Sequence, residues 1–305
     1  MLGMERLAVV TARMRFHARK FRLGIRSKDL VLDIGSGHSP HYRADVLCDI
    51  SLGDDRERGG PINLDRPFVI GDAESLPFRD KVFDFTICSH LLEHLRHPER
   101  CLAEMIRVGK RGHIECPSEF AEKLCGWPPH RWFVRRENGR LIFTQKVRPI
   151  YDETIASGTW KAWSQGDPAY HLFFWRNPQL FFVTYPWVDK IDYEIRSADA
   201  VKEELFVDAE PGVGKEPPRK TLRGWCRWDP AWENLFRHAL VSLLRARRRR
   251  EVNLFDLIAC PICKSGLLKQ EGRLVCLPCR KWYPLQGKVP VLLSSEARSL
   301  EGESG

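Results

Sequence analysis

Four cysteines near the C-terminal end occur as two closely spaced pairs, Cys260 with Cys263 and Cys276 with Cys279, and twelve residues separate the pairs. Two Cys-x-x-Cys turns at this spacing can present four thiolates tetrahedrally to one zinc ion. Because a site closed by four thiolates leaves no position open for catalysis, we expect a structural zinc ion here. The competing interpretation is a redox function for either pair.

A second candidate site lies in the first third of the chain, where an acidic residue follows each of three apolar runs. In an open parallel sheet, ligands bind beyond the carboxyl ends of the strands, so these acids would converge on one crevice. The turn after the first acid lacks the Lys-Ser/Thr of a phosphate-binding loop, and an acid in front of it would repel phosphate. We therefore expect a ligand with a cationic amine or ribose hydroxyls. The acids are Asp33, Asp49 and Asp72, and the turn contains Gly35, Ser36 and Gly37.

Three histidines are candidate general bases for a reaction that removes a proton from its acceptor. His90 and His94 follow the fourth apolar run and are four residues apart, which would place them on one helix face, with Glu93 pointing elsewhere. His130 lies just before a predicted hairpin. The alternative for each histidine is a structural role in packing.

An α/β fold is expected to position these residues. Short apolar runs alternate with turns and one helical stretch from about 91 to 108, a pattern typical of a mostly parallel sheet. Only eleven residues separate Gly37 from Asp49, too few for a helix plus a strand, so the first crossover is expected to be a turn. The predicted strands lie at 30–32, 44–50, 67–71, 83–89 and 113–116.

The region after residue 118 has a different composition. Nine of the ten tryptophans fall between Trp127 and Trp232, and Asn138-Gly139 separates two β-rich runs, which predicts a hairpin. We interpret residues of about 119–175 as an aromatic-rich insertion over one face of the sheet. The proline-containing stretch 208–219 is expected to be an exposed loop, and 232–249 a helix.

The chain has 305 residues and a formal net charge of +9, which is concentrated in two short segments. Residues 1–28 carry a net +7 and Arg245–Arg250 carry five arginines, so the remainder is net −3. A general nucleic-acid-binding surface therefore does not follow from the charge. A basic helix is expected over 4–22; it either packs beside the catalytic domain or contacts a membrane surface or polyanion.

The sequence predicts a basic N-terminal helix (1–28), an α/β domain (29–244), a basic linker (245–251), a cysteine-containing domain (252–298) and a tail (299–305). No apolar run approaches the roughly 18 residues needed to span a bilayer, and we see no secretory h-region. The six remaining cysteines are scattered, which favours reduced thiols. We therefore expect a cytoplasmic protein. The sequence does not specify an oligomeric state.

Residues 29–118 resemble the class I S-adenosylmethionine-dependent methyltransferases of type 11. The resemblance is carried by Val31-Leu32-Asp33-Ile34-Gly35-Ser36-Gly37, by Gly71-Asp72-Ala73-Glu74-Ser75-Leu76-Pro77-Phe78 and by Ser89-His90-Leu91-Leu92-Glu93-His94. It implies a Rossmann-like sheet that binds S-adenosylmethionine. Ser39 departs from the family pattern, which usually has a glycine there. The resemblance implies that Asp33, Gly35, Ser36 and Gly37 line the methionine and ribose, Asp49 the ribose hydroxyls, Asp72 and Ala73 the adenine, and Ser89 or His90 the sulfonium.

Residues 252–298 resemble the small zinc-ribbon activator subunit of certain tRNA, rRNA and release-factor methyltransferases. The resemblance runs from Leu254-Phe255-Asp256-Leu257-Ile258-Ala259-Cys260-Pro261 to Gly287-Lys288-Val289-Pro290-Val291-Leu292. It implies that this domain docks on the catalytic domain of the same chain and stabilises it. Joining the two raises their effective concentration, so docking needs little intrinsic affinity.

The favoured function is methyl transfer to a hydroxyl of a small molecule, lipid or glycan. The segment Ser89–His94 lacks an Asn/Asp-Pro-Pro-Tyr/Phe sequence, which enzymes that methylate nitrogen use to hold a planar amide or amine. One alternative, suggested by the ribbon and the basic segments, is an enzyme that modifies RNA or a translation factor. Another is a non-catalytic adaptor that binds no cofactor.

Overall fold

The structure is a computed structural model, and it describes residues 2–19, 23–53, 60–127, 129–146, 153–197 and 251–300. The predicted loop at 208–219, the predicted helix at 232–249 and the arginines of the linker lie outside the described residues. The chain divides into two compact units. The helical unit comprises Met1–Gly24, Glu115–Tyr185 and Asp192–Val241, and the sheet unit comprises Ile25–Ile114, Pro186–Ile191 and Ser242–Gly305.

The core of the sheet unit is a parallel sheet formed by short apolar strands. β1 (Val31–Ile34) pairs with β2 (Val46–Asp49) on one side and with β4 (Phe85–Ser89) on the other, and β2 pairs with β3 (Phe68–Gly71). Every residue of β1, β2 and β3 is buried, as expected for parallel strands that are covered on both faces. The full order is β13-β14-β3-β2-β1-β4-β5-β8, where β5 is Arg111–Pro117 and β8 is Phe182–Val188. The fold is thus the α/β sheet that the sequence predicts.

The connections in this sheet are mostly short. No helix lies between β1 and β2, whose linking residues are all described, in agreement with the spacing argument. A 3-10 turn, η2 (Ala73–Ser75), follows β3, and α2 (Pro98–Val108) precedes β5. The expected helix start near residue 91 is wrong: the segment from 91 to 97 forms turns, because Pro98 occupies the first helical turn, where its missing N–H costs nothing.

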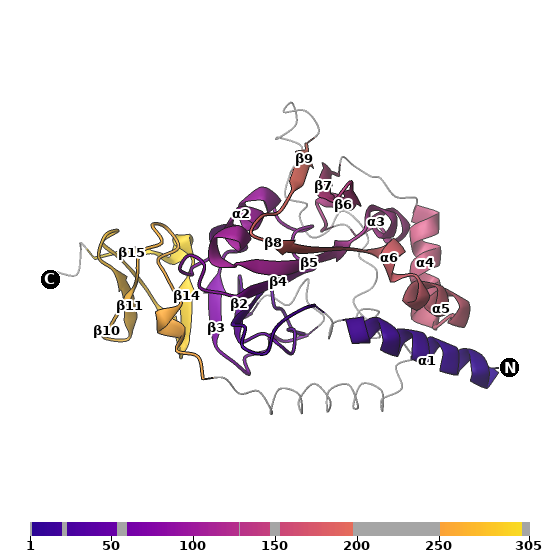
Figure 1. The fold of residues 1–305 in the computed structure, drawn as a ribbon, viewed down its shortest axis with the longest axis horizontal. Helices are drawn as coiled ribbons and strands as arrows, with labels where there is room; N and C mark the ends of the chain where they lie inside the picture. The colour runs from indigo at the N-terminus through magenta and orange to yellow at the C-terminus, as the bar shows by residue number, and fades with distance from the viewer. Residues whose placement is uncertain are drawn as a thin grey trace. The chain divides into compact units, whose positions relative to one another are not determined.

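The C-terminal ribbon also belongs to the sheet unit (Figure 1). It begins with the 3-10 turn η5 (Leu254–Asp256) and forms a sheet of order β10-β11-β12-β15, and β13 and β14 continue into the parallel sheet. β14 runs parallel to β3, with Val291 opposite Ile70 and Leu292 opposite Gly71. The ribbon therefore extends the same sheet whose strand ends carry the predicted cofactor residues. The bounds are β10 Leu268–Gln270, β11 Arg273–Cys276, β12 Lys281–Tyr283, β13 Leu285–Gln286, β14 Val289–Leu292, η6 Ser294–Glu296 and β15 Arg298–Ser299.

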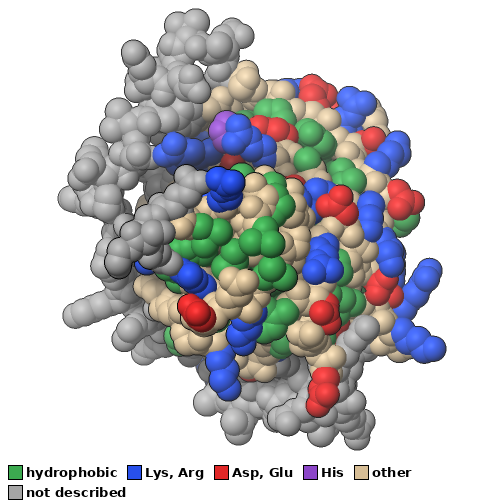
Figure 2. Space-filling view, turned by 90° about the vertical axis from the view of Figure 1, so that its left-hand side faces the viewer, with side chains coloured by type: hydrophobic (Ala, Val, Ile, Leu, Met, Phe, Trp, Pro, Cys, Tyr) green, Lys and Arg blue, Asp and Glu red, His purple; other side chains and the backbone are tan. Residues whose placement is uncertain are grey.

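The surface of the ribbon is mixed in character. Its residues 252–300 hold seven lysines and arginines against three aspartates and glutamates. Ile262 and Leu277, one in each Cys-x-x-Cys turn, are nonetheless exposed apolar side chains. Figure 2, which views the molecule from the ribbon side of Figure 1, shows hydrophobic side chains gathered between basic ones, with acidic side chains interspersed. This face is not the uniformly basic surface expected of a general nucleic-acid-binding domain.

The helical unit contains the N-terminal helix α1 (Leu2–Ala18), the helices α3 to α6 and a small three-stranded sheet of order β6-β7-β9. The hairpin of β6 and β7 turns at Asn138-Gly139, both with positive φ, which confirms the hairpin prediction. No helix of the described residues has the length and apolar character needed to cross a membrane. The remaining bounds are α3 Glu119–Cys125, β6 Trp132–Glu137, β7 Arg140–Gln145, α4 Glu153–Gln165, α5 Pro168–Arg176, α6 Pro178–Phe181 and β9 Tyr193–Arg196.

Candidate functional site

The glycine turn that follows β1 closes tightly against the end of β2. The Gly35 amide donates to the Cys48 carbonyl (2.9 Å), and Gly35 and Gly37 both have positive φ, at +67° and +51°. A Cβ atom at Gly35 would also lie only 2.9 Å from a methyl carbon of Leu91. Glycine is the residue that takes such a conformation without strain, so the sequence forms this turn here.

Two of the predicted acids hold the backbone of this turn in place. One carboxylate oxygen of Asp33 accepts from the His41 amide (2.7 Å). Asp49 accepts from the Gly37 amide (2.9 Å) through one oxygen and from the Ile50 amide (2.8 Å) through the other. Both carboxylates are buried in the sheet unit. The pairing of β1 with β2 therefore brings Asp33 and Asp49 to the same turn, from strands that are neighbours in the sheet.

The third acid, Asp72, directly follows β3 and caps the short turn η2. Its side chain accepts from the Glu74 amide (2.8 Å), and its carbonyl accepts from the Ser75 amide (3.0 Å). Ala73 is the first residue of that turn. The carboxylates of Asp49 and Asp72 both raise the pKa of Cys48, so they flank the same buried thiol. Asp33 lies near the end of β1, Asp49 ends β2 and Asp72 follows β3, so the three acids lie at the carboxyl ends of three adjacent strands.

Two buried cysteine thiols lie in the strands beneath this edge. Burial, followed by the nearby carboxylates, raises the pKa of Cys48 well above its usual value. A hydrogen bond with Cys101 is the main cause that raises the pKa of Cys88, with burial second. Both raised pKa values favour the protonated thiol near neutral pH, the form that is a poor nucleophile.

The end of β4 carries Ser89 and His90, beside β1 in the sheet. His90 has positive φ (+55°), a conformation that is uncommon for residues with a side chain. Its half-exposed ring lies 3.6 Å from a carboxylate oxygen of the buried Glu93. The prediction that Glu93 points away from the histidines is therefore wrong. The helix-face argument for His90 and His94 also fails, because both precede α2, and His94 lies in a turn closed by its amide on the Leu91 carbonyl.

His130 belongs to the helical unit, where it is held in a buried polar cluster. Its Nδ1 atom contacts a carboxylate oxygen of Glu122, and the other oxygen of that carboxylate contacts the Lys146 ammonium. The Trp127 ring stacks beside the imidazole at 5.4 Å between centroids. The Glu122 side chain has no exposed surface, and both of its carboxyl oxygens have a polar partner inside the protein. The His130 imidazole is thus fixed in orientation through its Nδ1 atom.

The four cysteines of the ribbon come together as the sequence predicts. Their sulfur atoms all lie within 4.8 Å of one another, on two turns of the ribbon. The Sγ atoms of Cys263 and Cys276 are 3.4 Å apart, and those of Cys260 and Cys279 are 3.9 Å apart. The Tyr283 hydroxyl lies 3.3 Å from Cys260 Sγ. Four thiols at these distances form a closed donor set that suits zinc.

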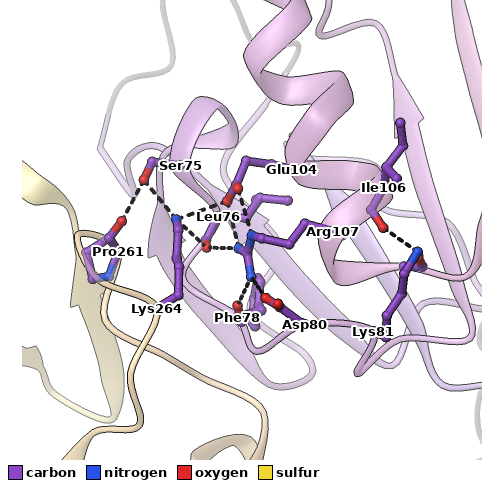
Figure 3. A network of polar contacts seen from close by, with 11 residues as sticks. Ser75, Leu76, Phe78, Asp80, Lys81, Glu104, Ile106, Arg107, Pro261 and Lys264 are labelled. Atoms are coloured by element: carbon purple, nitrogen blue, oxygen red, sulfur yellow. Dashed lines mark hydrogen bonds and ion pairs between the residues drawn. The ribbon is translucent and has the colours of Figure 1, made fainter. Parts of the chain in front are cut away.

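The ribbon also contacts the segment that follows the Asp72 turn. The Ser75 hydroxyl donates to the Pro261 carbonyl (2.7 Å), and the Lys264 ammonium contacts both Ser75 Oγ (3.0 Å) and Glu104 (3.0 Å). Figure 3 shows these side chains meeting where the ribbon approaches the sheet. Backbone hydrogen bonds reinforce the contact, from Ala259 to Pro77 and from Arg79 to Leu257, both at 2.9 Å.

Arg107 of α2 completes this network from the other side. Its guanidinium donates to the carbonyls of Leu76 (2.8 Å) and Phe78 (2.7 Å) and pairs with Glu104 (2.7 Å) and Asp80 (2.7 Å) (Figure 3). Sequence reasoning missed Lys264, Glu104 and Arg107. The position of Lys264, directly after the first Cys-x-x-Cys turn, was the one local signal available.

Comparisons with known proteins match the two halves of the sheet unit to different families. A family model described as a methyltransferase domain matches residues 32–114. A demethylmenaquinone methyltransferase of Paenarthrobacter aurescens is 34% identical over 110 residues, which cover 35% of this chain and 43% of that protein. The corresponding protein of Renibacterium salmoninarum is 35% identical over 106 residues, 34% of this chain and 44% of that protein. The chain therefore spans less than half the length of these two methyltransferases.

The C-terminal region of this chain matches a different family, and the match covers nearly the full length of that family's small proteins. A model described as Trm112p-like protein covers residues 252–287. A UPF0434 protein of Methylobacillus flagellatus is 46% identical over 55 residues, which are 17% of this chain and 92% of that protein.

Among solved structures, a Haloferax volcanii complex of the Trm112 methyltransferase activator with a methyltransferase aligns with 15% identity and a TM-score of 0.34, covering 60% of this chain and 92% of that chain.

Proposed function

Because this chain belongs to the class I S-adenosylmethionine-dependent methyltransferases and ends in a Trm112p-like ribbon of the UPF0434 type, we propose that it methylates a hydroxyl of a small molecule, lipid or glycan. The observation that carries this proposal is the set of three acids at the ends of adjacent strands around a positive-φ glycine turn. Two relatives are named demethylmenaquinone methyltransferases, and these names support a small-molecule acceptor without bearing on which atom is methylated.

The residues at this edge fit S-adenosylmethionine by their chemistry. Carboxylates favour a ligand that carries a cationic amine or hydroxyl donors, and those of Asp33 and Asp49 lie at the turn itself, where they accept from the His41 and Gly37 amides. The Ser36 hydroxyl is buried and has no hydrogen-bond partner in the described part of the chain, so it is available to a ligand. When bound, S-adenosylmethionine supplies a methyl group that its sulfonium has already activated.

In the proposed arrangement, Asp33, Gly35, Ser36 and Gly37 hold the methionine and ribose portions of the cofactor. Asp49 accepts from the ribose hydroxyls, and Asp72 with Ala73 contacts the adenine. Ser89 borders the reacting centre. The protein's main contribution is to hold donor and acceptor in line, because positioning supplies much of the rate enhancement in such a displacement. Each of these roles is a proposal that rests on the shared position of the residues at the strand ends.

A hydroxyl acceptor must also lose a proton, and we propose His90, His94 and His130 as the candidate bases. His90 Nδ1 faces Glu93, and His130 Nδ1 faces Glu122, so in each case Nε2 is the atom left to receive the proton. A carboxylate on the far nitrogen fixes the ring and stabilises the imidazolium once it forms. His130 is held more firmly, because its carboxylate partner is also paired with Lys146.

We propose that the ribbon is an activator in cis, held together by one structural zinc ion on Cys260, Cys263, Cys276 and Cys279. The zinc ion would fix the two Cys-x-x-Cys turns, and Lys264 directly follows one of them. Through Ser75 and Pro77, the ribbon contacts the residues that come directly after the proposed adenine contact. Ordering the ribbon therefore stabilises the loop that the cofactor needs.

Methyl transfer from labelled S-adenosylmethionine to fractionated extracts of the source cell tests the substrate class. We expect label in the lipid, glycan or small-molecule fraction, and we expect an Asp33→Asn variant to transfer much less at a limiting concentration of S-adenosylmethionine. Label in RNA or in a translation factor would overturn the proposed acceptor but not the methyltransferase assignment. Absence of label in every fraction, together with absence of cofactor binding, would favour the adaptor alternative.

A further inference from the structure

The N-terminal helix α1 packs on α5 through one of its faces. Val9, Ala12 and Phe16, at spacings of three and four residues, are buried in the helical unit. The Phe16 ring meets the Trp175 ring edge-on at 4.8 Å and lies 5.4 Å from the Phe182 ring. The helix is therefore anchored by aromatic packing within its own unit, and among the described residues Leu7 and Met14 on its other faces are exposed.

A groove of about 560 Å³ runs along this helix inside the helical unit. We call it the α1 groove. Apolar residues form most of its lining, and the charged residues among those that line it are all arginines. It is defined by Leu7, Arg15, Phe16, Arg19, Trp175 and Arg176.

The arginines of the α1 groove differ in how far they are already engaged. Arg19 pairs with Glu115 (3.2 Å) and lies over the Phe16 ring at 3.9 Å. Arg15 and Arg176 are exposed, and neither has a hydrogen bond or ion pair through its guanidinium within the described ranges. The α1 groove therefore has two positively charged side chains, Arg15 and Arg176, that are positioned to bind an anionic partner.

Large apolar side chains beside the groove face the solvent. Leu7 is 67% exposed and Met14 is 49% exposed, and their spacing of seven residues places them on one side of α1. Phe173 on α5 and Leu180 on α6 are also exposed. Exposed apolar side chains next to unpaired arginines are the combination found on helices that lie in the interface of an anionic membrane.

We propose that the α1 groove and the exposed side chains beside it form a docking surface for anionic phospholipid. Arg15 and Arg176 bind the phosphate headgroups, while Leu7 and Met14 enter the boundary between headgroups and acyl chains. An RNA partner would use the arginines but would leave Leu7 and Met14 in water, so lipid accounts for both features. The inference does not depend on the proposed methyl transfer, because it rests on residues of the helical unit alone.

Co-sedimentation of the full chain with vesicles, without cofactor, tests the proposal. We expect binding to phosphatidylcholine vesicles that contain about 30% phosphatidylglycerol and much weaker binding to phosphatidylcholine alone. Each arginine near an anionic surface is worth about fivefold in affinity, so the double variant Arg15→Glu/Arg176→Glu should lose at least about 25-fold. The double variant Leu7→Ser/Met14→Ser should lose binding to a similar degree.

Matched controls come from α4 of the same unit. Lys161→Glu reverses an exposed charge, and Ile155→Ser replaces an apolar side chain that is 53% exposed, both outside the residues lining the groove. We expect these controls to bind the vesicles like the unmodified chain, and all variants to keep their thermal unfolding transition. Equal binding to both kinds of vesicle, or equal loss in the α4 controls, would overturn the proposal.

Two further arms separate a lipid surface from a site for free anions or nucleic acid. Inorganic phosphate and glycerol phosphate at millimolar concentration should fail to displace the protein from the vesicles, because they offer no apolar surface. Displacement by either compound would instead assign the groove to a soluble phosphate. Binding of RNA with higher affinity than the vesicles, lost in Arg15→Glu/Arg176→Glu and kept in Leu7→Ser/Met14→Ser, would also overturn the proposal.

Discussion

Single carboxylates at the strand ends have a structural role in this protein and a second, proposed role in cofactor binding. Asp33 and Asp49 hold the backbone of the glycine turn through hydrogen bonds to His41 and Gly37, and we propose that the same carboxylates contact the cofactor. A backbone amide is satisfied by an amide oxygen as well as by a carboxylate, whereas a cationic or hydroxyl-bearing ligand responds to the charge. Replacing Asp33 by asparagine therefore separates the structural role from the binding role, whereas Asp49 accepts backbone amides through both oxygens and asparagine could satisfy only one of them.

We predict that Asp33→Asn weakens binding of S-adenosylhomocysteine about tenfold or more while leaving the unfolding temperature within a few degrees, since a hydrogen bond to a charged group is worth about 1.5–3 kcal/mol. Titration calorimetry measures the first effect and scanning calorimetry the second. Asp65→Asn is the matched control, because Asp65 lies in the same unit with a more exposed side chain paired to Arg66. Unchanged affinity in Asp33→Asn would remove Asp33 from the cofactor site.

The histidine pairs predict different losses of activity for single variants. If His130 is the base, His130→Gln should lower kcat by about 100-fold. Glu122→Gln should lower kcat less, because the imidazole itself remains in place. His90→Gln is the matched comparison, and a loss of kcat confined to His90→Gln would assign the base to His90.

At the scale of elements, the sequence predicted the strands beneath the site but not how the ribbon joins them. The strands predicted from the apolar runs, the absence of a helix between β1 and β2, and the Asn138-Gly139 hairpin are all confirmed. Each of these predictions depends only on residues that are close together in the sequence. Pairing of β14 with β3 joins residues more than two hundred positions apart, and no local pattern encodes it. The helix start was misplaced because the apolar spacing from Leu91 outweighed the signal of Pro98.

The same scale carries a prediction about the docked ribbon. Lys264→Met and Glu104→Gln should each destabilise the protein by about 1–3 kcal/mol, since each leaves a partly buried hydrogen-bonding group without its charged partner. The double variant should lose much less than the sum, because the two residues share one interaction. Denaturant unfolding measures these values, with the exposed Lys288→Met as control. Additive losses would show that the pair is not coupled.

The Glu104 contact also predicts a pH dependence. Burial opposes ionisation of this carboxyl, but hydrogen bonds and charges from Arg107 and Lys264 outweigh it and hold the pKa of Glu104 below its usual 4.5. A carboxyl with a lowered pKa stabilises the folded state above its unfolded pKa and loses that contribution as the pH falls through the folded pKa. Between pH 5 and 3, stability should therefore fall less steeply in Glu104→Gln. If the unfolding free energy of Glu104→Gln fell with pH as steeply as that of the unmodified chain, the pairing of Glu104 with Lys264 and Arg107 would be contradicted.

For the whole molecule, the main feature is that the ribbon and the parallel sheet belong to one compact unit. β13 and β14 extend the parallel sheet, and the Lys264 network ties the ribbon to the segment after Asp72. This architecture couples an expected zinc ion in the ribbon to a proposed cofactor site on the strand ends.

Removing the zinc ion should therefore weaken the cofactor site as well as the ribbon. We predict one zinc ion per chain by elemental analysis. Chelation should lower the unfolding temperature and weaken S-adenosylhomocysteine binding at least about tenfold, because metal binding contributes directly to folding of such ribbons. Re-addition of zinc should restore both properties. If the chelated protein bound S-adenosylhomocysteine normally, the ribbon would not support the segment after Asp72. Full solubility and activity of a chain that ends at Arg250 would lead to the same conclusion.

Titration of the zinc-loaded full chain with S-adenosylhomocysteine tests the central claim most directly. We predict one molecule bound per chain, displaced by S-adenosylmethionine, and no binding in Gly35→Trp, where a bulky side chain would fill the turn that already touches Leu91. Absence of binding to the unmodified chain, or normal binding by Gly35→Trp, would contradict the assignment of the strand-end acids to a cofactor site.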